Sequence, residues 1–341
     1  MESVKTKKIV TFGEVMMRLS PPGNATYSQA TSLDFLFGGG EANVAISLAY
    51  FGVKACHVTQ FPDTNLGRGA TQFLRHHWID TSHVFYGEGD MGLYFLEKGA
   101  VHRPSEIIYQ RSHSAFTKID ANTIDWKNIL EGATWFHWTG ITPAISQGSA
   151  DACAAAIKAA NELGVIVSGD IHSRSSLWKY GKSQKEIMPK LIEGCDIVIA
   201  SRYDVDKNCD LKINEKDDNE FREAASRLMN QLPRIKKVID KDRVSLSASH
   251  NRIKGKLWNG ESIVESQEYD ITHIVDRIGT GDAFAAGLIY GLMNFKDDSE
   301  ALNFATAACA LKHSIEGDAN LGSADRVLNL MRGDTSGRIQ R

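Results

Sequence analysis

A carboxylate directly after two closely spaced glycines is the pattern of an anion site beside a general base, and Gly279-Thr280-Gly281-Asp282 has this pattern. Glycines let the backbone turn its N–H groups toward one point, and the positive end of a following helix favours a phosphate there. We expect the same helix dipole to hold Asp282 ionised. Such a carboxylate suits phosphoryl transfer, in which it accepts a hydroxyl proton. On this segment alone, a glycine-rich turn with an aspartate that stabilises a helix start is an equal alternative.

The element that must position Asp282 is a helix that follows Gly281. Its apolar residues recur at helical spacing, and two glycines lie on nearly the same stripe: Phe284, Leu288, Leu292, Gly287 and Gly291. Each interior glycine costs a helix about 1 kcal/mol relative to alanine. The two glycines therefore predict a close approach between this helix and a neighbouring element.

Length, charge and cysteine content limit the class of protein. The 341 residues suffice for one large α/β domain. The formal net charge of −3 gives no general field for nucleic acid or for an anionic membrane, so we expect neither as a partner. Neither a signal peptide nor a run of about 18 apolar residues is found, which favours a cytoplasmic protein. The 5 cysteines lack paired ligand spacing, which disfavours zinc and a disulfide framework.

Strand and helix patterns alternate along the chain. The expected strands are 9–12, 55–58, 134–138, 165–168 and 196–200, and the expected helices are 42–51, 149–163 and 186–193. Crossover helices between strands imply a mostly parallel sheet with both faces covered, so we expect a doubly wound α/β sandwich. Two stretches, 18–37 and 92–109, are rich in aromatic and β-branched residues, which favours the short strands of a lid. Ordinary edge strands are the alternative.

Two segments far apart in the chain, Phe37-Gly38-Gly39-Gly40-Glu41-Ala42-Asn43-Val44-Ala45 and Gly279-Thr280-Gly281-Asp282, resemble the two signatures of ribokinase-like (PfkB) sugar kinases. The resemblance is greatest to the 2-keto-3-deoxygluconate kinases, through segments 12–23, 92–99, 103–111, 135–141 and 311–318. It implies a ribokinase-like three-layer sandwich over residues 1–330, a small β-sheet lid formed by about 14–37 and 88–112, and a C-terminal tail over 331–341. In this family the lid often pairs with that of a second subunit, which implies a homo-oligomer.

The resemblance also implies an activity. The expected reaction is transfer of the γ-phosphoryl group of ATP to the terminal hydroxyl of 2-keto-3-deoxygluconate, giving its 6-phosphate. Asp282 would be the base and Gly279–Gly281 the anion hole, with Mg²⁺ and K⁺ as cofactors. Two alternatives remain open: a kinase for another ketose or hexose, and a catalytically weakened homologue that binds sugar or nucleotide as a sensor.

Substrate and nucleotide positions follow from the same resemblance. Contacts to the sugar acid are expected from Gly38, Gly39, Asn43, Tyr94, Tyr109, Arg111, Arg174 and Asp318. Arg111 and Arg174 would bind its carboxylate, because the planar guanidinium fork matches that group, whereas a surface ion pair is the alternative for each arginine alone. His172 replaces a usual asparagine, and a hydrogen-bonding spacer is favoured over a catalytic role. Contacts to the nucleotide are expected from Ser247, Ser249, Asn251, Gly279 and Gly281, with helix 303–312 beside the adenosine, although a core helix is the simpler interpretation of 303–312.

The metal positions are where the sequence departs from the family pattern. Asp204 would hold Mg²⁺ through water, and Asp276 would open a monovalent-cation loop, although an Asp there commonly just caps the loop. Ser201 and Arg202 replace the usual Asn and Glu, and Arg202 would compete with Mg²⁺ if it pointed inward. The segment 240–243 introduces two acids near the presumed phosphates, where like charges are costly.

Overall fold

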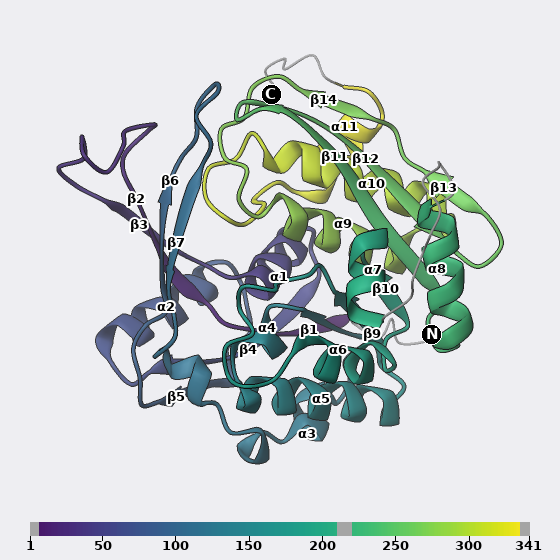
Figure 1. The fold of residues 1–341 in the computed structure, drawn as a ribbon, viewed down its shortest axis with the longest axis horizontal. Helices are drawn as coiled ribbons and strands as arrows, with labels where there is room; N and C mark the ends of the chain where they lie inside the picture. Colours follow the sequence, from purple (N-terminus) through teal and green to yellow (C-terminus); the bar gives the residue numbers. More distant parts are fainter. Residues whose placement is uncertain (1–6, 210–219, 335–341) are drawn as a thin grey trace, which may run out of the picture.

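The computed structural model describes residues 7–209 and 220–334, and a large twisted sheet runs through its centre (Figure 1). The strand order is β13-β12-β11-β10-β9-β8-β1-β4-β5, with β14 beside β12. These strands are β1 (Lys8–Phe12), β4 (Lys54–Pro62), β5 (Val84–Gly87), β8 (Trp135–Thr139), β9 (Ile166–Asp170), β10 (Ile197–Ile199), β11 (Lys237–Ser247), β12 (His250–Trp258), β13 (Ile263–Glu265) and β14 (Tyr269–Ile271). All pairs from β11 to β5 are parallel, whereas β12 pairs antiparallel with its neighbours.

Helices cover both faces of this sheet. One face carries α1 (Gly40–Tyr50), α2 (Asn65–His76), α9 (Thr280–Asn294), α10 (Asp298–Lys312) and α11 (Ala324–Met331). The other carries α3 (Trp126–Leu130), α5 (Gln147–Glu162), α6 (Gln184–Ile192), α7 (Arg202–Cys209) and α8 (Glu220–Gln231), with the short turns α4 (Thr142–Ile145), η1 (Ala115–Lys118) and η2 (Ala121–Thr123) nearby. Successive strand residues alternate between the two layers, since Ile9 packs against one and Val10 against the other. The expected doubly wound α/β sandwich is confirmed.

A second, smaller sheet stands at one end of the main sheet (Figure 1). Its order is β3-β2-β6-β7, formed by β2 (Met16–Ser20), β3 (Asp34–Gly38), β6 (Leu93–Glu97) and β7 (Glu106–Gln110). Only the central β2–β6 pair is parallel. These strands lie within the expected lid ranges 14–37 and 88–112, except that β3 ends one residue beyond the first range. The expected small separate sheet is confirmed.

The expected elements of the main domain are all present. The three helices agree with the expected bounds within two residues, and the strand expected at 55–58 is longer because β4 continues to Pro62. At the C-terminus, α11 ends at Met331, and residues 335–341 of the expected tail lie outside the described residues. Among residues 7–209 and 220–334, no helix has the length and apolar character needed to cross a membrane.

The close approach predicted from the helix glycines is found between α9 and α10. A Cβ atom on Gly287 would lie 2.8 Å from Cα of Ala305, and one on Gly291 would lie 2.7 Å from Cα of Ala301. Neither side chain could fit without moving a backbone. The two helices thus pack closely, with small alanine side chains between them, and α9 is the helix that carries Asp282.

Candidate active site

A cavity of about 770 Å³ opens between the C-terminal ends of the main-sheet strands and the small sheet. This is the edge at which open parallel α/β sheets bind ligands. Thirteen of the residues expected at the catalytic, substrate, nucleotide or metal positions line it: Gly38, Gly39, Asn43, Tyr94, Tyr109, Arg111, Arg174, Asp204, Gly279, Thr280, Gly281, Asp282 and Asp318. Segments separated by more than two hundred residues therefore meet around one space.

The start of α9 has the local structure of an anion site. Gly279 is the N-cap with φ of 73°, a left-handed conformation that favours glycine. A Cβ atom there would also lie 1.6 Å from the backbone oxygen of Asp318. Among the residues that the structure describes, no side chain caps this helix, so the first-turn N–H groups of Thr280 and Gly281 remain available to a ligand at the positive end of the dipole.

Asp282 lies in this first turn and is hydrogen-bonded by α1. The side-chain amide of Asn43 donates to Asp282 Oδ2 at 2.7 Å. Burial raises the pKa of Asp282 to about 7, and the nearby carboxylates of Asp170 and Asp318 act in the same direction. The expectation that Asp282 is held ionised is therefore wrong at neutral pH, because desolvation raises the pKa and leaves this carboxyl partly protonated. A base whose pKa lies near neutral pH is better matched to accept a hydroxyl proton.

Three cations that sequence reasoning missed also line the cavity: Lys241, Arg243 and Arg277. The first two lie on β11, where residues alternate between the faces. Lys241 approaches the anion site, since its Nζ lies 3.8 Å from where a Cβ atom of Gly281 would be.

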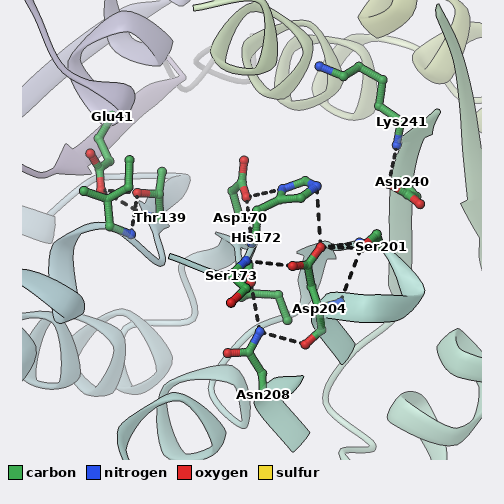
Figure 2. A network of polar contacts seen from close by, with 12 residues as sticks. Glu41, Thr139, Asp170, His172, Ser173, Ser201, Asp204, Asn208, Asp240 and Lys241 are labelled. Atoms are coloured by element: carbon green, nitrogen blue, oxygen red, sulfur yellow. Dashed lines mark hydrogen bonds and ion pairs between the residues drawn. The ribbon is translucent and has the colours of Figure 1, made fainter. Parts of the chain in front are cut away.

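The two acids of this strand point elsewhere, and neither lines the cavity. Asp242 forms an ion pair with Lys256 at 2.6 Å. Asp240 is buried, and its side chain and that of Lys241 extend in opposite directions (Figure 2). Neither acid therefore faces the cavity directly, and their expected repulsion of bound phosphates stays a prediction. The period-two alternation of a strand was the signal that could have separated the cations from the acids.

A polar cluster joins the loops that follow β9 and β10 (Figure 2). Asp204 accepts hydrogen bonds from the backbone N–H of Ser173 at 2.7 Å and from the backbone N–H of Ser201 at 3.0 Å, and also from the Ser201 hydroxyl. His172 lies between two carboxylates, with Nδ1 2.6 Å from Asp170 Oδ1 and Nε2 3.8 Å from Asp204 Oδ2. Asp204 thus holds two loops together, and both of its oxygens are already engaged.

The charges of this cluster follow from its burial and its neighbours. Burial alone would lower the pKa of His172, but the carboxylates of Asp170, Asp204 and Asp240 raise it to about 8. Burial alone would raise the pKa of Asp170, but His172 and Arg174 hold it well below its usual range. At neutral pH the cluster therefore contains an imidazolium ion among carboxylates. In the described parts of the chain, no group of three or more His, Cys, Asp or Glu residues could hold a metal ion directly.

Arg202 does not line the cavity. Its guanidinium pairs with Glu220 at 3.1 Å and with Asp206 at 3.9 Å, which directs it toward α8. The condition under which Arg202 would compete with Mg²⁺, an inward-pointing side chain, is not met.

The two arginines expected to bind a carboxylate differ in their surroundings. Arg111 Nε donates to Glu14 Oε2 at 2.7 Å, so its charge is already balanced by a buried glutamate. Arg174 is exposed in the cavity wall, and within residues 7–209 and 220–334 its guanidinium has no ion pair and no side-chain hydrogen bond. Arg174 is thus the better placed of the two to receive an anionic group.

Three residues expected at the nucleotide do not line the cavity: Ser247, Ser249 and Asn251. Asn251 is fully buried, with Nδ2 3.3 Å from His313 Nε2. The Ser249 hydroxyl accepts a hydrogen bond from the backbone of Val101, and that of Ser247 accepts one from the backbone of Ser249. Helix α10, expected beside the adenosine, is mostly buried in the core.

Asp276, expected at a monovalent cation, is buried beneath the anion site rather than in the cavity wall. It forms an ion pair with Arg18 of the small sheet at 2.8 Å. Asp318 pairs with the same guanidinium at 2.8 Å and accepts a hydrogen bond from the Tyr94 hydroxyl. Arg18 was absent from the sequence-based site, because nothing in its local sequence shows that two distant acids surround it.

Comparisons with known proteins agree with this geometry. The sequence model of the pfkB family carbohydrate kinases matches residues 6–323. The chain is 30% identical over 334 residues to 2-dehydro-3-deoxygalactonokinase of Haloferax volcanii, covering 97% of this chain and 99% of the relative. It is 29% identical to 5-dehydro-2-deoxygluconokinase of Geobacillus thermodenitrificans, covering 80% and 77%. The crystal structure of 2-dehydro-3-deoxygluconokinase from Thermotoga maritima superposes with a TM-score of 0.91 at 38% identity, covering 96% of this chain and 98% of that one.

Proposed function

The chain belongs to the pfkB family of carbohydrate kinases, and from that premise we propose that it transfers the γ-phosphoryl group of ATP to the terminal hydroxyl of a sugar acid. The preferred substrate is 2-keto-3-deoxygluconate, which yields the 6-phosphate. One observation carries the proposal: the base Asp282, the anion site Gly279–Gly281 and the guanidinium of Arg174 open into the same cavity. A kinase for a sugar acid needs these three groups together.

Different residues of this chain accept the proton and stabilise the transferring phosphoryl group. Asp282 accepts the proton of the attacking hydroxyl while Asn43 orients its carboxylate. The first-turn N–H groups of α9 and the ammonium of Lys241 stabilise the charge on the transferring phosphoryl group. Positioning and charge neutralisation of this kind supply most of the rate in phosphoryl transfer.

ATP fits the cation-lined side of the cavity. Arg243 and Arg277 are available there for the phosphates, together with Lys241. Mg²⁺ keeps several waters and binds substrate phosphates in such sites, and its chemistry would be to neutralise phosphate charge. Asp170 and Asp204 line the cavity as carboxylates for contacts through water, although the hydrogen bonds that Asp204 accepts make its role in holding the loops the stronger one.

The substrate carboxylate is assigned to Arg174. A charged hydrogen bond contributes about 1.5–3 kcal/mol, and the planar guanidinium can bind both carboxylate oxygens. Tyr94 and Tyr109 form the adjoining wall, with ring centroids 5.9 Å apart. The relatives act on several keto-deoxy acids by name, so a kinase for another such sugar is the second candidate.

The proposal is tested with the purified protein, Mg-ATP and a substrate panel. The panel holds 2-keto-3-deoxygluconate, its galactonate epimer, 5-keto-2-deoxygluconate and the neutral sugars fructose and ribose, with ADP release as the readout and the Asp282→Asn variant as the background control. We expect the highest kcat/KM for a keto-deoxy acid. A higher kcat/KM for a neutral sugar would overturn the substrate class. Binding without turnover on every compound would establish the sensor alternative.

Association through the small sheet is part of the same proposal. An apolar row crosses its four strands on the face opposite Tyr94 and Tyr109, in the register Phe35-Leu19-Phe95-Ile108. Phe35 is 63% exposed and Ile108 is 45% exposed, which is typical of a face that another surface covers. Sedimentation should show an oligomer that Phe35→Asp with Ile108→Asp dissociates, whereas Val244→Asp on β11 should not. The cytoplasmic location stays a prediction.

A further inference from the structure

A buried cluster of opposite charges lies directly beneath the anion site. It contains the basic residues Arg18 of β2 and Lys312 of α10, and the acids Asp276 and Asp318. Lys312 Nζ donates to the backbone oxygen of Ile315 at 2.8 Å. The side chains of Arg18, Asp276 and Asp318 are 2%, 1% and 4% exposed, and Lys312 is fully buried. Such groups are costly to bury unless each is paired, so the partners of each one define what the cluster can hold.

Both oxygens of Asp276 have partners within the protein. Oδ1 accepts a hydrogen bond from the backbone N–H of Ile278 at 3.0 Å. Oδ2 accepts one from the backbone N–H of Gly317 at 3.2 Å and lies 2.8 Å from Nη2 of Arg18. A monovalent cation at this carboxylate would lie beside the like charge of a buried guanidinium. The residues at this position therefore do not fit the monovalent cation that the family resemblance implies.

The second terminal nitrogen of the Arg18 guanidinium contacts Asp318 in the cavity wall. Nη1 lies 2.8 Å from Asp318 Oδ1, and Nε donates to the Ser20 hydroxyl at 3.0 Å. Asp318 in turn packs against two glycines of the site. A Cβ atom on Gly38 would lie 2.3 Å from its Oδ2, and one on Gly279 would lie 1.6 Å from its backbone oxygen. One guanidinium thus ties the small sheet to the loop before α9 and to the wall of the substrate cavity.

We infer that Arg18 supplies from within the chain the positive charge that a bound monovalent cation would place beside Asp276, and that it is a positioning residue for the Gly279–Gly281 loop. The planar fork of arginine can bridge two carboxylates at once, which a lysine ammonium or a spherical ion does less well. Burial alone would lower the pKa of Arg18, but Asp318 and Asp276 raise it above its usual value, so the guanidinium remains charged. Turnover should accordingly need no added K⁺ or Na⁺.

The first test compares K⁺, Na⁺ and choline chloride at equal ionic strength. The Tm of the parent protein should be the same in all three salts, and kcat should differ by less than a factor of about two, because a charge built into the fold is not exchanged. A higher Tm in K⁺ than in choline, or turnover that requires K⁺, would overturn the inference. The kinetic arm rests on the proposed kinase function, whereas the Tm arm does not, so the two failures are distinguishable.

The second test changes Arg18. Arg18→Ala leaves two buried carboxylates without their partner and should lower the Tm by about 10 °C. Misplacing the anion site should lower kcat by about 100-fold. Millimolar guanidinium chloride should partly restore the Tm and kcat of Arg18→Ala. A general packing defect would not show this rescue.

Arg18→Lys keeps the positive charge, so it can still be tested if the alanine variant does not fold. It should preserve the fold yet raise the KM for ATP, since one ammonium cannot hold both carboxylates in the same geometry. Arg103→Ala removes another arginine that joins the small sheet to its loops, through Glu97 and the backbone of Asn24, and is the matched control. It should change neither KM nor the response to guanidinium. Parent-like KM and Tm in Arg18→Lys, or loss in Arg18→Ala without rescue, would overturn the positioning role.

Discussion

Replacing Asp282 with asparagine should separate catalysis from stability. Asparagine keeps the size of the side chain and can still accept the hydrogen bond from Asn43, but it cannot accept a proton. Loss of a general base lowers turnover by roughly 10²- to 10⁴-fold. The same change should stabilise the fold, because burial disfavours the ionised carboxylate.

The size of the stability gain follows from the pKa. A rise from 3.8 to about 7 corresponds to about 4 kcal/mol at about 1.4 kcal/mol per pKa step. Because the folded-state pKa of this acid is raised, the parent loses stability as pH rises from about 4 to about 7. The variant should therefore match the parent at the acid end of this window and exceed it most at pH 7 and above.

Urea unfolding of both proteins across this pH range measures the gain, and Asp151→Asn on α5, an exposed acid, is the control that should show none. The kcat/KM of the parent should also fall about tenfold per pH step below about 7, since the base must be deprotonated. Equal stability of parent and variant at pH 8 would refute the raised pKa. Variant turnover within a factor of about three of the parent would refute the assignment as base.

Other predictions follow from the cavity wall. Arg174→Ala should weaken a sugar acid by about 1.5–3 kcal/mol and leave a neutral sugar unchanged, and equal losses in the two KM values would show that Arg174 is structural. Lys241→Ala should lower kcat and raise the KM for ATP, whereas Lys256→Ala, which loses the ion pair with Asp242, should do neither. The double change Ser201→Asn with Arg202→Glu should leave the Mg²⁺ dependence of turnover unaltered, because Arg202 faces Glu220; a lower Mg²⁺ requirement would contradict that orientation.

Much of the site could be predicted from local patterns. The glycines around Thr280 and the acid that follows them predicted the helix start of α9 and its free backbone donors, because these are properties of a few consecutive residues. The helical spacing of Gly287 and Gly291 likewise predicted the close packing of α9, which the contacts with Ala301 and Ala305 confirm. Alternating strand and helix patterns were sufficient for the fold class.

What the sequence could not determine are the pairings between distant residues and the solvation that results from them. Asn43 meets Asp282 across 239 positions, and Arg18 meets Asp318 across 300. Such contacts depend on how layers pack and not on spacing along the chain. The pKa of Asp282 reverses the sequence-based expectation for the same reason, since desolvation exists only once the cavity is built. The sequence by itself determined which chemical groups are present and which local elements carry them, whereas the tertiary structure alone decided which charges face one another and which face water.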